Sequence, residues 1–466
     1  MPTLPDSYES VEALTDDLNN FIQTPLVRQI TGGIHVNDAF IHDAWNTLPL
    51  EWTAYWDSES QSRDHRLMQQ DMIDSIDEGE HRLSGTKTHE TNAKETSNPP
   101  DSLVRWLGQL KSVSLPRAQR QGPVLALPEE LTLHMKTKKR NEVSVAAAYI
   151  HQLCQTNNLT RVIDMGSGQG YLSVTLAYLF PSLRILAVDG SASQIAGSQA
   201  LASSLGIPED RLRHLVRYID GSMSLTKEIE CWAGGERCVL VGLHACGSLS
   251  EHMLRYFDRC ASISHLAAVG CCYNHIVMRS EGCPDGFPIS ERLRDRGVTL
   301  SPTALMTGCQ APNNWERLDP NKERSSYARK QFYRALLEKM LYDKGLQVDD
   351  ADNHRPNWGI RKGDLATFEK FTRRAVHCLG VNQSKVSRED IEAYEARYAG
   401  QEGRIALLWT LSVFCCKAVE SIIALDRYWY LVEHAAEKVD IVPIFEYKIS
   451  PRNLMIVAEK GRGASV

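Results

Sequence analysis

The sequence predicts an α/β protein built around a doubly wound, mostly parallel sheet, and three observations indicate this fold. Residues 161–190 give a short apolar β run, a glycine-rich turn, a helical segment and a second β run. Two further β runs, Cys238–Leu243 and His265–Val269, alternate with helical segments, which is the order expected of a parallel sheet covered by helices. Two last β runs, Asp440–Tyr447 and Asn453–Lys460, are joined by a short connection and are expected to close the sheet as a terminal pair.

Composition narrows the class of protein. A length of 466 residues suggests about two or three domains. The formal net charge of −6 argues against a globally basic nucleic-acid-binding surface, although local basic patches remain compatible with it. Twelve cysteines in a chain without a recognisable signal peptide indicate reduced thiols in an intracellular protein, cytoplasmic or nuclear. The most apolar run, Ile405–Cys416, is shorter than the roughly 20 residues that a membrane span needs, so no transmembrane segment is predicted.

The regions outside the sheet are predicted to be mainly helical. Apolar residues recur at helical spacing over 11–21, whereas the aromatic stretch Glu51–Trp56 is expected to form a turn packed on the core. Residues 74–101 hold almost no large apolar side chain and are predicted to be disordered. The predicted domains are a helical N-terminal region, a sheet domain and a helical insertion, at residues 1–130, 131–276 with 437–461, and 277–436. Helices of the insertion are expected at Tyr327–Gly345, Lys362–Leu379, Ser387–Tyr398 and Arg404–Ala436.

The turn after the first β run has the pattern of a nucleotide-binding loop. Glycine lacks a Cβ, so a glycine turn can press against a ligand and expose amide groups at a helix N-terminus. A carboxylate at the tip of the next strand suits hydrogen bonds to ribose hydroxyls. The candidate cofactor-binding residues here are Asp164, Gly166, Ser167, Gly168, Gln169, Gly170, Asp189 and Gly190. The spacing Asp-x-Gly-x-Gly-x-Gly differs from the dinucleotide pattern GxGxxG and is typical of class I methyltransferases, so S-adenosylmethionine is the predicted cofactor; the alternative is a turn that binds no ligand.

Further candidates flank this loop. A third β run, Arg211–Val216, is followed by Asp220, which is expected near the adenine ring. Before the first strand, the basic run Lys136–Arg140 opens an alanine-rich helix. Such a run is ordinarily a solvated basic turn. In class I methyltransferases, however, the preceding helix borders the methionine end of the cofactor, where Lys138 or Glu142 can meet its charged groups.

Four stretches of chemically active residues follow predicted strands. They are Gly166–Gly170, Asp189, His244–Gly247 and Cys271–His275. In a doubly wound sheet, ligands bind at the carboxyl ends of the strands, so these stretches are expected to converge.

An ordered series of motifs, spread over about 135–460, resembles the methyltransferase-like protein 25 family, some of whose members carry an rRNA-adenine-dimethylase-domain name. The motifs are VIDMGSGQGYLS, VGLHACGSLS, VGCCYNHI, GFPIS, GCQAPNNW, LDRYWYLVE and VPIFEYKISPRNLMIVAEK. The His-x-Cys-Gly and Cys-Cys pair is also similar to the core of tRNA 2′-O-methyltransferases. Those enzymes carry N-terminal Cys/His zinc modules, whereas no cysteine precedes Cys154 here. Where relatives read KKxHE, this chain has Lys138-Lys139-Arg140-Asn141-Glu142.

The resemblance implies a class I methyltransferase-like (Rossmann-like) domain that uses S-adenosylmethionine. It leaves the acceptor open. The Asn/Asp-Pro-Pro-Tyr motif of amino-directed base methyltransferases is missing, and Gly270-Cys271-Cys272-Tyr273 lies one strand later than that motif. Base N-methylation is therefore not inferred.

The candidate catalytic residues are His244, Cys271, Cys272 and Tyr273, and each has an alternative role. His244 can act as a base or contact the cofactor, or it can be hydrogen-bonded within the sheet edge. The two cysteines can be small residues that let the protein backbone approach the substrate, thiolate nucleophiles, or zinc ligands together with Cys246, His275 or Cys283. No Cys-x-x-Cys pair occurs, so no metal site is predicted. Tyr273 can stack on a base or an adenine ring, or it can fill the core.

Three functions fit these observations. The first is methylation of ribosomal or transfer RNA, with Lys136–Arg140 and the helical insertion guiding the backbone. The second is methylation of a ribosomal or other translation-related protein, which the net acidity and the lack of a recognised RNA-binding module favour. The third is a scaffold that keeps the fold without turnover, and the intact Asp164–Gly170 and Asp189 pattern argues against it. No membrane partner is expected.

Overall fold

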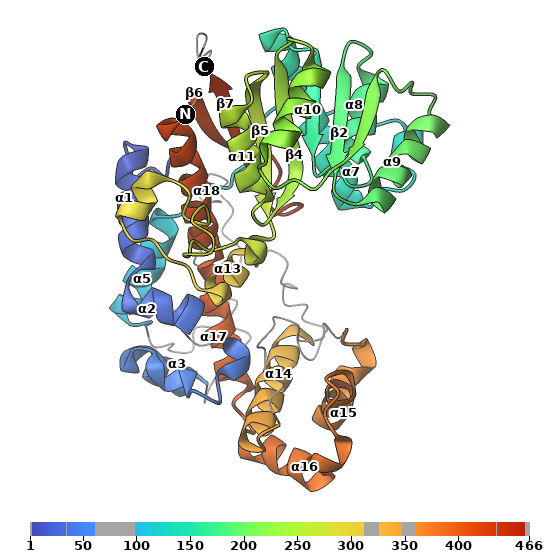
Figure 1. The fold of residues 1–466 in the computed structure, drawn as a ribbon. Coiled ribbons are helices and arrows are strands. Elements are labelled where there is room, and N and C mark those ends of the chain that lie inside the picture. The colour runs from blue at the N-terminus through green and yellow to red at the C-terminus, as the bar shows by residue number, and fades with distance from the viewer. Residues whose placement is uncertain are drawn as a thin grey trace, which may run out of the picture. The chain divides into compact units, whose positions relative to one another are not determined.

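The computed structural model describes residues 2–33, 35–60, 98–311, 326–346, 359–434 and 436–461. Of the segment predicted to be disordered, 74–101, residues 74–97 lie outside the described residues. The chain divides into two compact units (Figure 1). Unit 1 comprises residues 1–22, 113–309 and 417–466, and unit 2 comprises residues 23–112 and 310–416.

Unit 1 is built on a seven-stranded sheet with the order β3-β2-β1-β4-β5-β7-β6. The strands β1 to β5 are parallel, while β7 runs antiparallel to both β5 and β6. Their bounds are β1 Arg161–Met165, β2 Arg184–Asp189, β3 Leu212–Val216, β4 Cys238–Cys246, β5 Ile263–Cys271, β6 Ala436–Pro443 and β7 Leu454–Lys460. This mixed sheet confirms the predicted doubly wound, Rossmann-like class.

Helices alternate with the parallel strands. Those of unit 1 are α1 Val11–Ile22, α6 Glu129–Thr132, α7 Thr137–Asn157, α8 Tyr171–Leu179, α9 Ala192–Ser204, α10 Met223–Ala233, α11 Leu249–Arg259, α12 Glu291–Asp295, α13 Pro302–Gly308 and α18 Cys416–Glu433, with the 3-10 turn η4 Tyr273–His275. Helix α7 packs against α8, and α8 against α9, while α11 packs on β4 and β5. The small side chains Ala146 and Ala147 of α7 are fully buried in the core formed with Val162 of β1, so this helix lies close to the sheet.

Unit 1 extends beyond the predicted sheet domain, because it also takes in residues 1–22, 113–130, 277–309 and 417–436. Buried polar contacts tie the last two of these segments to the unit. The carboxylate of Asp426 in α18 accepts hydrogen bonds from the backbone N–H groups of Ile289 at 3.0 Å and Ser290 at 2.9 Å. Arg427 donates to the Ser250 hydroxyl in α11 at 2.8 Å. Breaking such buried pairs would leave unpaired charges, so these segments stay with the sheet.

Unit 2 is helical. Its elements are α2 Pro25–Arg28, η1 Gln29–Gly33, η2 Val36–Asp38, η3 Ala44–Thr47, α3 Leu50–Glu59, α5 Asp101–Ser112, α14 Ser326–Asp343, η6 Lys362–Ala366, α15 Phe368–Cys378, η7 Gln383–Lys385, α16 Arg388–Arg397 and α17 Glu402–Phe414. The turn predicted at Glu51–Trp56 was wrong, because this stretch lies within α3. Trp52 and Trp56 stand one helical turn apart and are 1% and 2% exposed, so the aromatic residues bury one helix face.

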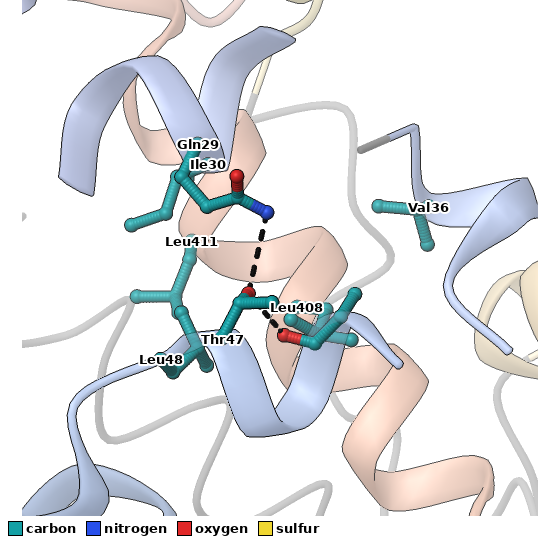
Figure 2. A pocket seen from close by; sticks show the side chains of 8 residues that line it. Gln29, Ile30, Val36, Thr47, Leu48, Leu408 and Leu411 are labelled. Atoms are coloured by element: carbon teal, nitrogen blue, oxygen red, sulfur yellow. Dashed lines mark hydrogen bonds between the residues drawn. The ribbon is translucent and has the colours of Figure 1, made fainter. Parts of the chain in front are cut away.

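A small apolar cavity lies within unit 2 (Figure 2). Ile30, Leu408 and Leu411 are among its lining residues, and Gln29 Nε2 donates a hydrogen bond to Thr47 Oγ1 at its edge, at 3.2 Å. The cavity holds about 20 Å³, which is room for about one water molecule. It is therefore too small for a nucleoside cofactor.

The stretch Glu402–Glu433, which contains α17 and α18, has the length and hydropathy of a membrane span. Its most apolar window has a mean hydropathy of 1.6, but 89% of that window is buried inside the protein. Core helices meet the same criteria, so this is weak evidence for a span. The expectation that no segment crosses a membrane stays a prediction.

Candidate active site

The glycine turn joins β1 to α8 in a conformation that few other residues adopt. Gly166, Gly168 and Gly170 have φ values of 71°, 54° and 72°, in the left-handed region where a Cβ costs about 1–2 kcal/mol. The backbone N–H groups of Gly166 and Ser167 donate to the Val188 carbonyl at 2.9 and 3.1 Å. The turn is thereby held beside the end of β2.

The glycines of the turn have different structural roles. A Cβ on Gly170 would lie 1.8 Å from Ser198 Oγ in α9, so this glycine lets two helices approach. A Cβ on Gly168 would meet nothing closer than Gln194 Oε1 at 4.0 Å. The space outside Gly168 is open, as a turn that cradles a ligand requires. The exposed Gln169 side chain instead lies over Gly197 of α9.

Asp189 ends β2 with its carboxylate against this turn. One oxygen accepts a hydrogen bond from the Gly168 N–H at 2.9 Å, and the other accepts from the Ser191 N–H at 2.8 Å. Each carboxylate oxygen can accept about two hydrogen bonds, so both retain capacity for ribose hydroxyls. The half-buried Asp189 is therefore suited to its predicted role beside the exposed Gly190.

Asp164 lies deeper than the other acid. It is 2% exposed, and its carboxylate accepts a hydrogen bond from the Ser173 hydroxyl of α8 at 2.5 Å. Burial raises the pKa of Asp164 to about 6, although the hydrogen bond from Ser173 opposes this rise. The contact ties β1 to α8 across the glycine turn, which favours positioning of the turn over direct contact with a cofactor.

Tyr218, two residues past β3, is a candidate that the sequence did not single out. It is 82% exposed, which is unusual for a tyrosine, and a Cβ on Gly190 would lie 3.6 Å from its ring. Such a ring beside Asp189 can stack on an adenine base. The predicted Asp220 is also exposed, and its carboxylate accepts the Ser222 N–H at 2.9 Å. Hydrogen bonds from the side chain and the backbone of Ser222 lower the pKa of Asp220. The signal available in the sequence was a tyrosine two residues after the third predicted β run.

His244, near the end of β4, meets Glu142 of α7. Its Nε2 lies 3.1 Å from Glu142 Oε2, and 36% of the His244 side chain is exposed. Glu142 is buried, and its other oxygen accepts from the Ser450 hydroxyl at 2.8 Å. Both histidine and acid were predicted site residues, and the structure brings them together.

The charge on Glu142 is strongly favoured. Burial raises the pKa of this carboxyl, but the hydrogen bond and charge of His244, with the charge of Lys139, outweigh burial and lower the pKa to about 2. Lys139 Nζ lies 3.4 Å and Lys138 Nζ 3.8 Å from the carboxylate. The predicted residue Lys138 thus contacts Glu142, and the acid is ionised at neutral pH.

The remaining predicted catalytic residues, Cys271, Cys272 and Tyr273, lie at and just after the end of β5, beside Cys246, the last residue of β4. The sulfur atoms of Cys246 and Cys271 lie 3.2 Å apart, and those of Cys271 and Cys272 lie 3.7 Å apart. Tyr273 is 4% exposed and donates a hydrogen bond to Glu420 of α18 at 2.8 Å. Of the two roles open for Tyr273, this burial supports filling the core over stacking on a base.

Comparisons with known proteins bear on this site. Residues 138–279 match a family described as a methyltransferase domain. The chain is 28% identical over 234 residues to "Probable methyltransferase-like protein 25" of Mus musculus, covering 48% of this chain and 38% of that protein. The Homo sapiens protein of the same name is 28% identical over 233 residues, covering 48% and 37%. A solved structure of magnesium protoporphyrin IX methyltransferase from Synechocystis PCC 6803 with bound SAM matches with 14% identity and a TM-score of 0.23, covering 38% of this chain and 89% of that one.

The matched residues contain β1 to β5, the glycine turn, Asp189, the His244–Glu142 pair and the three cysteines. The chain spans about two fifths of the length of the curated relatives that it matches. Residues 138–279 thus match a methyltransferase domain, and the predicted resemblance to the methyltransferase-like protein 25 family is confirmed.

Proposed function

We propose that this protein transfers the methyl group of S-adenosylmethionine to RNA, with His244 as general base. One observation carries the proposal. The glycine turn, Asp189 and the His244–Glu142 pair lie at the carboxyl ends of β1, β2 and β4, and β1 is hydrogen-bonded to both other strands. A cofactor-binding turn and an acid–histidine pair therefore border one edge of the sheet.

Four groups of the chain would hold the cofactor. The open face of Gly168 admits it, the Asp189 carboxylate accepts its ribose hydroxyls, and the Tyr218 ring covers its adenine. The cofactor supplies an electrophilic methyl group on a sulfonium centre. The protein orients the acceptor toward that methyl and takes up the proton that the acceptor loses.

The His244–Glu142 contact indicates which ring nitrogen takes this proton. Because the Glu142 carboxylate is ionised and can only accept hydrogen bonds, His244 Nε2 carries the proton of their contact. In the neutral imidazole, the other nitrogen, Nδ1, carries no proton and can accept one from the acceptor. Glu142 is the positioning residue, since it fixes the tautomer and orientation of the ring.

The basic start of α7 supports RNA as the acceptor. Lys136, Lys138 and Arg140 are exposed there, on the same helix that carries Glu142. Cations beside the reaction centre can neutralise phosphates and place the nucleic-acid backbone. A base such as His244 suits an acceptor that must lose a proton, for example a ribose hydroxyl.

The test is methyl transfer from labelled S-adenosylmethionine to total cellular RNA and, separately, to total cellular protein. We expect nuclease-sensitive label in RNA, falling as salt rises. Lys136→Ala/Arg140→Ala should lower transfer, whereas Arg184→Ala/Lys227→Ala, which removes two exposed cations elsewhere in unit 1, should not. Label confined to protein would overturn the RNA acceptor and support protein methylation, while no label in either, despite cofactor binding, would favour the scaffold function.

Asp189→Ala is expected to weaken S-adenosylmethionine binding about 10- to 100-fold, because two charge-assisted hydrogen bonds to the ribose are lost. Calorimetry measures the affinity, and circular dichroism should show an unchanged fold. Asp210→Ala, which removes an exposed acid that follows α9, serves as the control. A loss of folded signal in Asp189→Ala would instead assign the residue a structural role.

Tyr218→Ala is expected to weaken cofactor binding by about 1–2 kcal/mol, or roughly 5- to 30-fold, because the adenine loses a stacking partner. Tyr218→Phe keeps the ring and should bind as the wild type does. Tyr178→Ala removes another exposed tyrosine, from α8, and should leave the affinity unchanged. Equal affinity of Tyr218→Ala and the wild type would remove this residue from the site.

A further inference from the structure

Three cysteines gather where β4 and β5 end, although they come from separate parts of the sequence. Cys246 and Cys271 are register partners on these neighbouring parallel strands, so their side chains emerge on one face. A register shift between Gly242 and Ala245 creates this pairing. Without the shift, the offset between Gly242 and Ala268 would continue, and Cys246 would face Cys272 instead. Such irregularities re-aim side chains near functional sites.

The backbone at Cys272 brings the third sulfur to the same place. Adjacent residues of a strand point to opposite faces, which would separate the side chains of Cys271 and Cys272. Cys272 instead adopts φ 48° and ψ 50°, a left-handed conformation that costs a residue with a Cβ about 1–2 kcal/mol. As a result, the sulfur atoms of Cys246, Cys271 and Cys272 all lie within 4.8 Å of one another.

We propose that Cys246, Cys271 and Cys272 bind one thiophilic divalent cation, for which Zn²⁺ is the expected ion. Zinc–sulfur bonds of about 2.3 Å place tetrahedral sulfur ligands about 3.8 Å apart. The observed sulfur separations of 3.2 and 3.7 Å, with 4.8 Å as the upper limit, surround that value. Zinc sites with three protein ligands keep a fourth position for water or substrate. Cys246 is exposed, so solvent can reach the cluster.

The nearby Cys309 forms hydrogen bonds outside the cysteine cluster. Its sulfur donates a hydrogen bond to the Asn274 side chain at 3.2 Å and accepts one from the Asn274 N–H at 3.4 Å. Cys309 is therefore not among the proposed ligands. The sequence leaves zinc binding as one of three roles for Cys271 and Cys272 but predicts no metal site, because the two cysteine stretches are separated by 25 residues and lack Cys-x-x-Cys spacing.

The experiment measures metal content of the full chain, purified with a reductant and without chelators, by elemental mass spectrometry. Uptake of Co²⁺ is followed by the thiolate-to-cobalt absorption in the near ultraviolet. We expect about one metal ion per chain and a cobalt–thiolate band. Cys246→Ser/Cys271→Ser should lose both, whereas Cys231→Ser, which alters an exposed cysteine of α10, should keep both.

The single variant Cys246→Ser shows whether metal loss in the double variant reflects misfolding, because this exposed side chain contributes little to the core. It should keep its circular-dichroism spectrum and bind Co²⁺ roughly tenfold more weakly or worse. A fully reduced wild-type chain that neither contains metal nor takes up Co²⁺ would overturn the proposal, as would metal retained by the double variant. S-adenosylmethionine binding is measured alongside, so that a failure of the metal site is distinguished from a failure of the proposed function.

Discussion

Gly168→Arg is expected to abolish S-adenosylmethionine binding in calorimetry. The wild-type turn leaves the space outside Gly168 open, with no atom within 4.0 Å of a Cβ except Gln194 Oε1 at that distance. An arginine side chain would occupy this space, where the proposed contacts to Asp189 would place the cofactor. The backbone φ of 54° adds about 1–2 kcal/mol of strain, so loss of binding has to be separated from loss of stability.

Two variants make that separation. Gly206→Arg introduces the same side chain at φ 67°, also with open space around its Cβ, but after α9 and away from the turn. It carries a comparable strain and should still bind the cofactor. Gly168→Ala carries the strain at the original position without the bulk and should bind measurably. Unchanged affinity in Gly168→Arg would show that the cofactor does not use this turn.

The sequence was most informative where the chemistry is local. The strand, glycine turn, helix and terminal acid of 161–189 lie within one unit of the fold, and their spacing alone predicts that the turn and Asp189 meet. The Gly168 N–H and Asp189 carboxylate are 2.9 Å apart in the structure. The strands were likewise predictable, since β4 and β5 are almost entirely buried and read as continuous apolar runs.

Contacts that depend on register could not be predicted in this way. His244 and Glu142 lie 102 residues apart, and only the packing of α7 against β4 pairs them. The cysteine cluster requires both a register shift in β4 and a left-handed residue at Cys272, and neither has a sequence signature. Helix α3 replaces the predicted turn because Trp52 and Trp56, spaced four apart, bury one face of a helix.

The two parts of the proposed site also differ in how many other roles their residues could have. The proposed cofactor turn depends on a left-handed backbone that glycine adopts most readily, so few other residue types could replace its glycines. The proposed methyl-transfer chemistry depends on the His244–Glu142 pair, and this contact can serve either catalysis or the stability of the sheet edge. Kinetics can separate these two roles, because a structural contact contributes to the free energy of unfolding while a base contributes to the barrier of the reaction.

His244→Ala is expected to lower kcat by about 100- to 10,000-fold, which is the usual contribution of a general base. The affinity for S-adenosylmethionine should stay within a fewfold of the wild type, because the proposed cofactor contacts come from other residues. Methyl transfer at saturating cofactor and calorimetric binding measure the two quantities. A weakened affinity with unchanged kcat would instead make His244 a cofactor contact.

Glu142→Gln tests the positioning role with a side chain of nearly equal size. The amide can donate to His244 Nε2, which would leave Nδ1 protonated and unable to act as the base. We expect kcat to fall by about 10- to 1,000-fold and its pH dependence to change, since a wrong tautomer rather than a lost ring limits the reaction. Ser450→Ala is the matched control, because it removes the hydrogen bond to Glu142 Oε1 and leaves the 3.1 Å contact between His244 and Oε2 in place. If Ser450→Ala and Glu142→Gln lowered kcat equally, the carboxylate would act through the stability of the sheet edge, and the assignment of His244 as the base would lose its support.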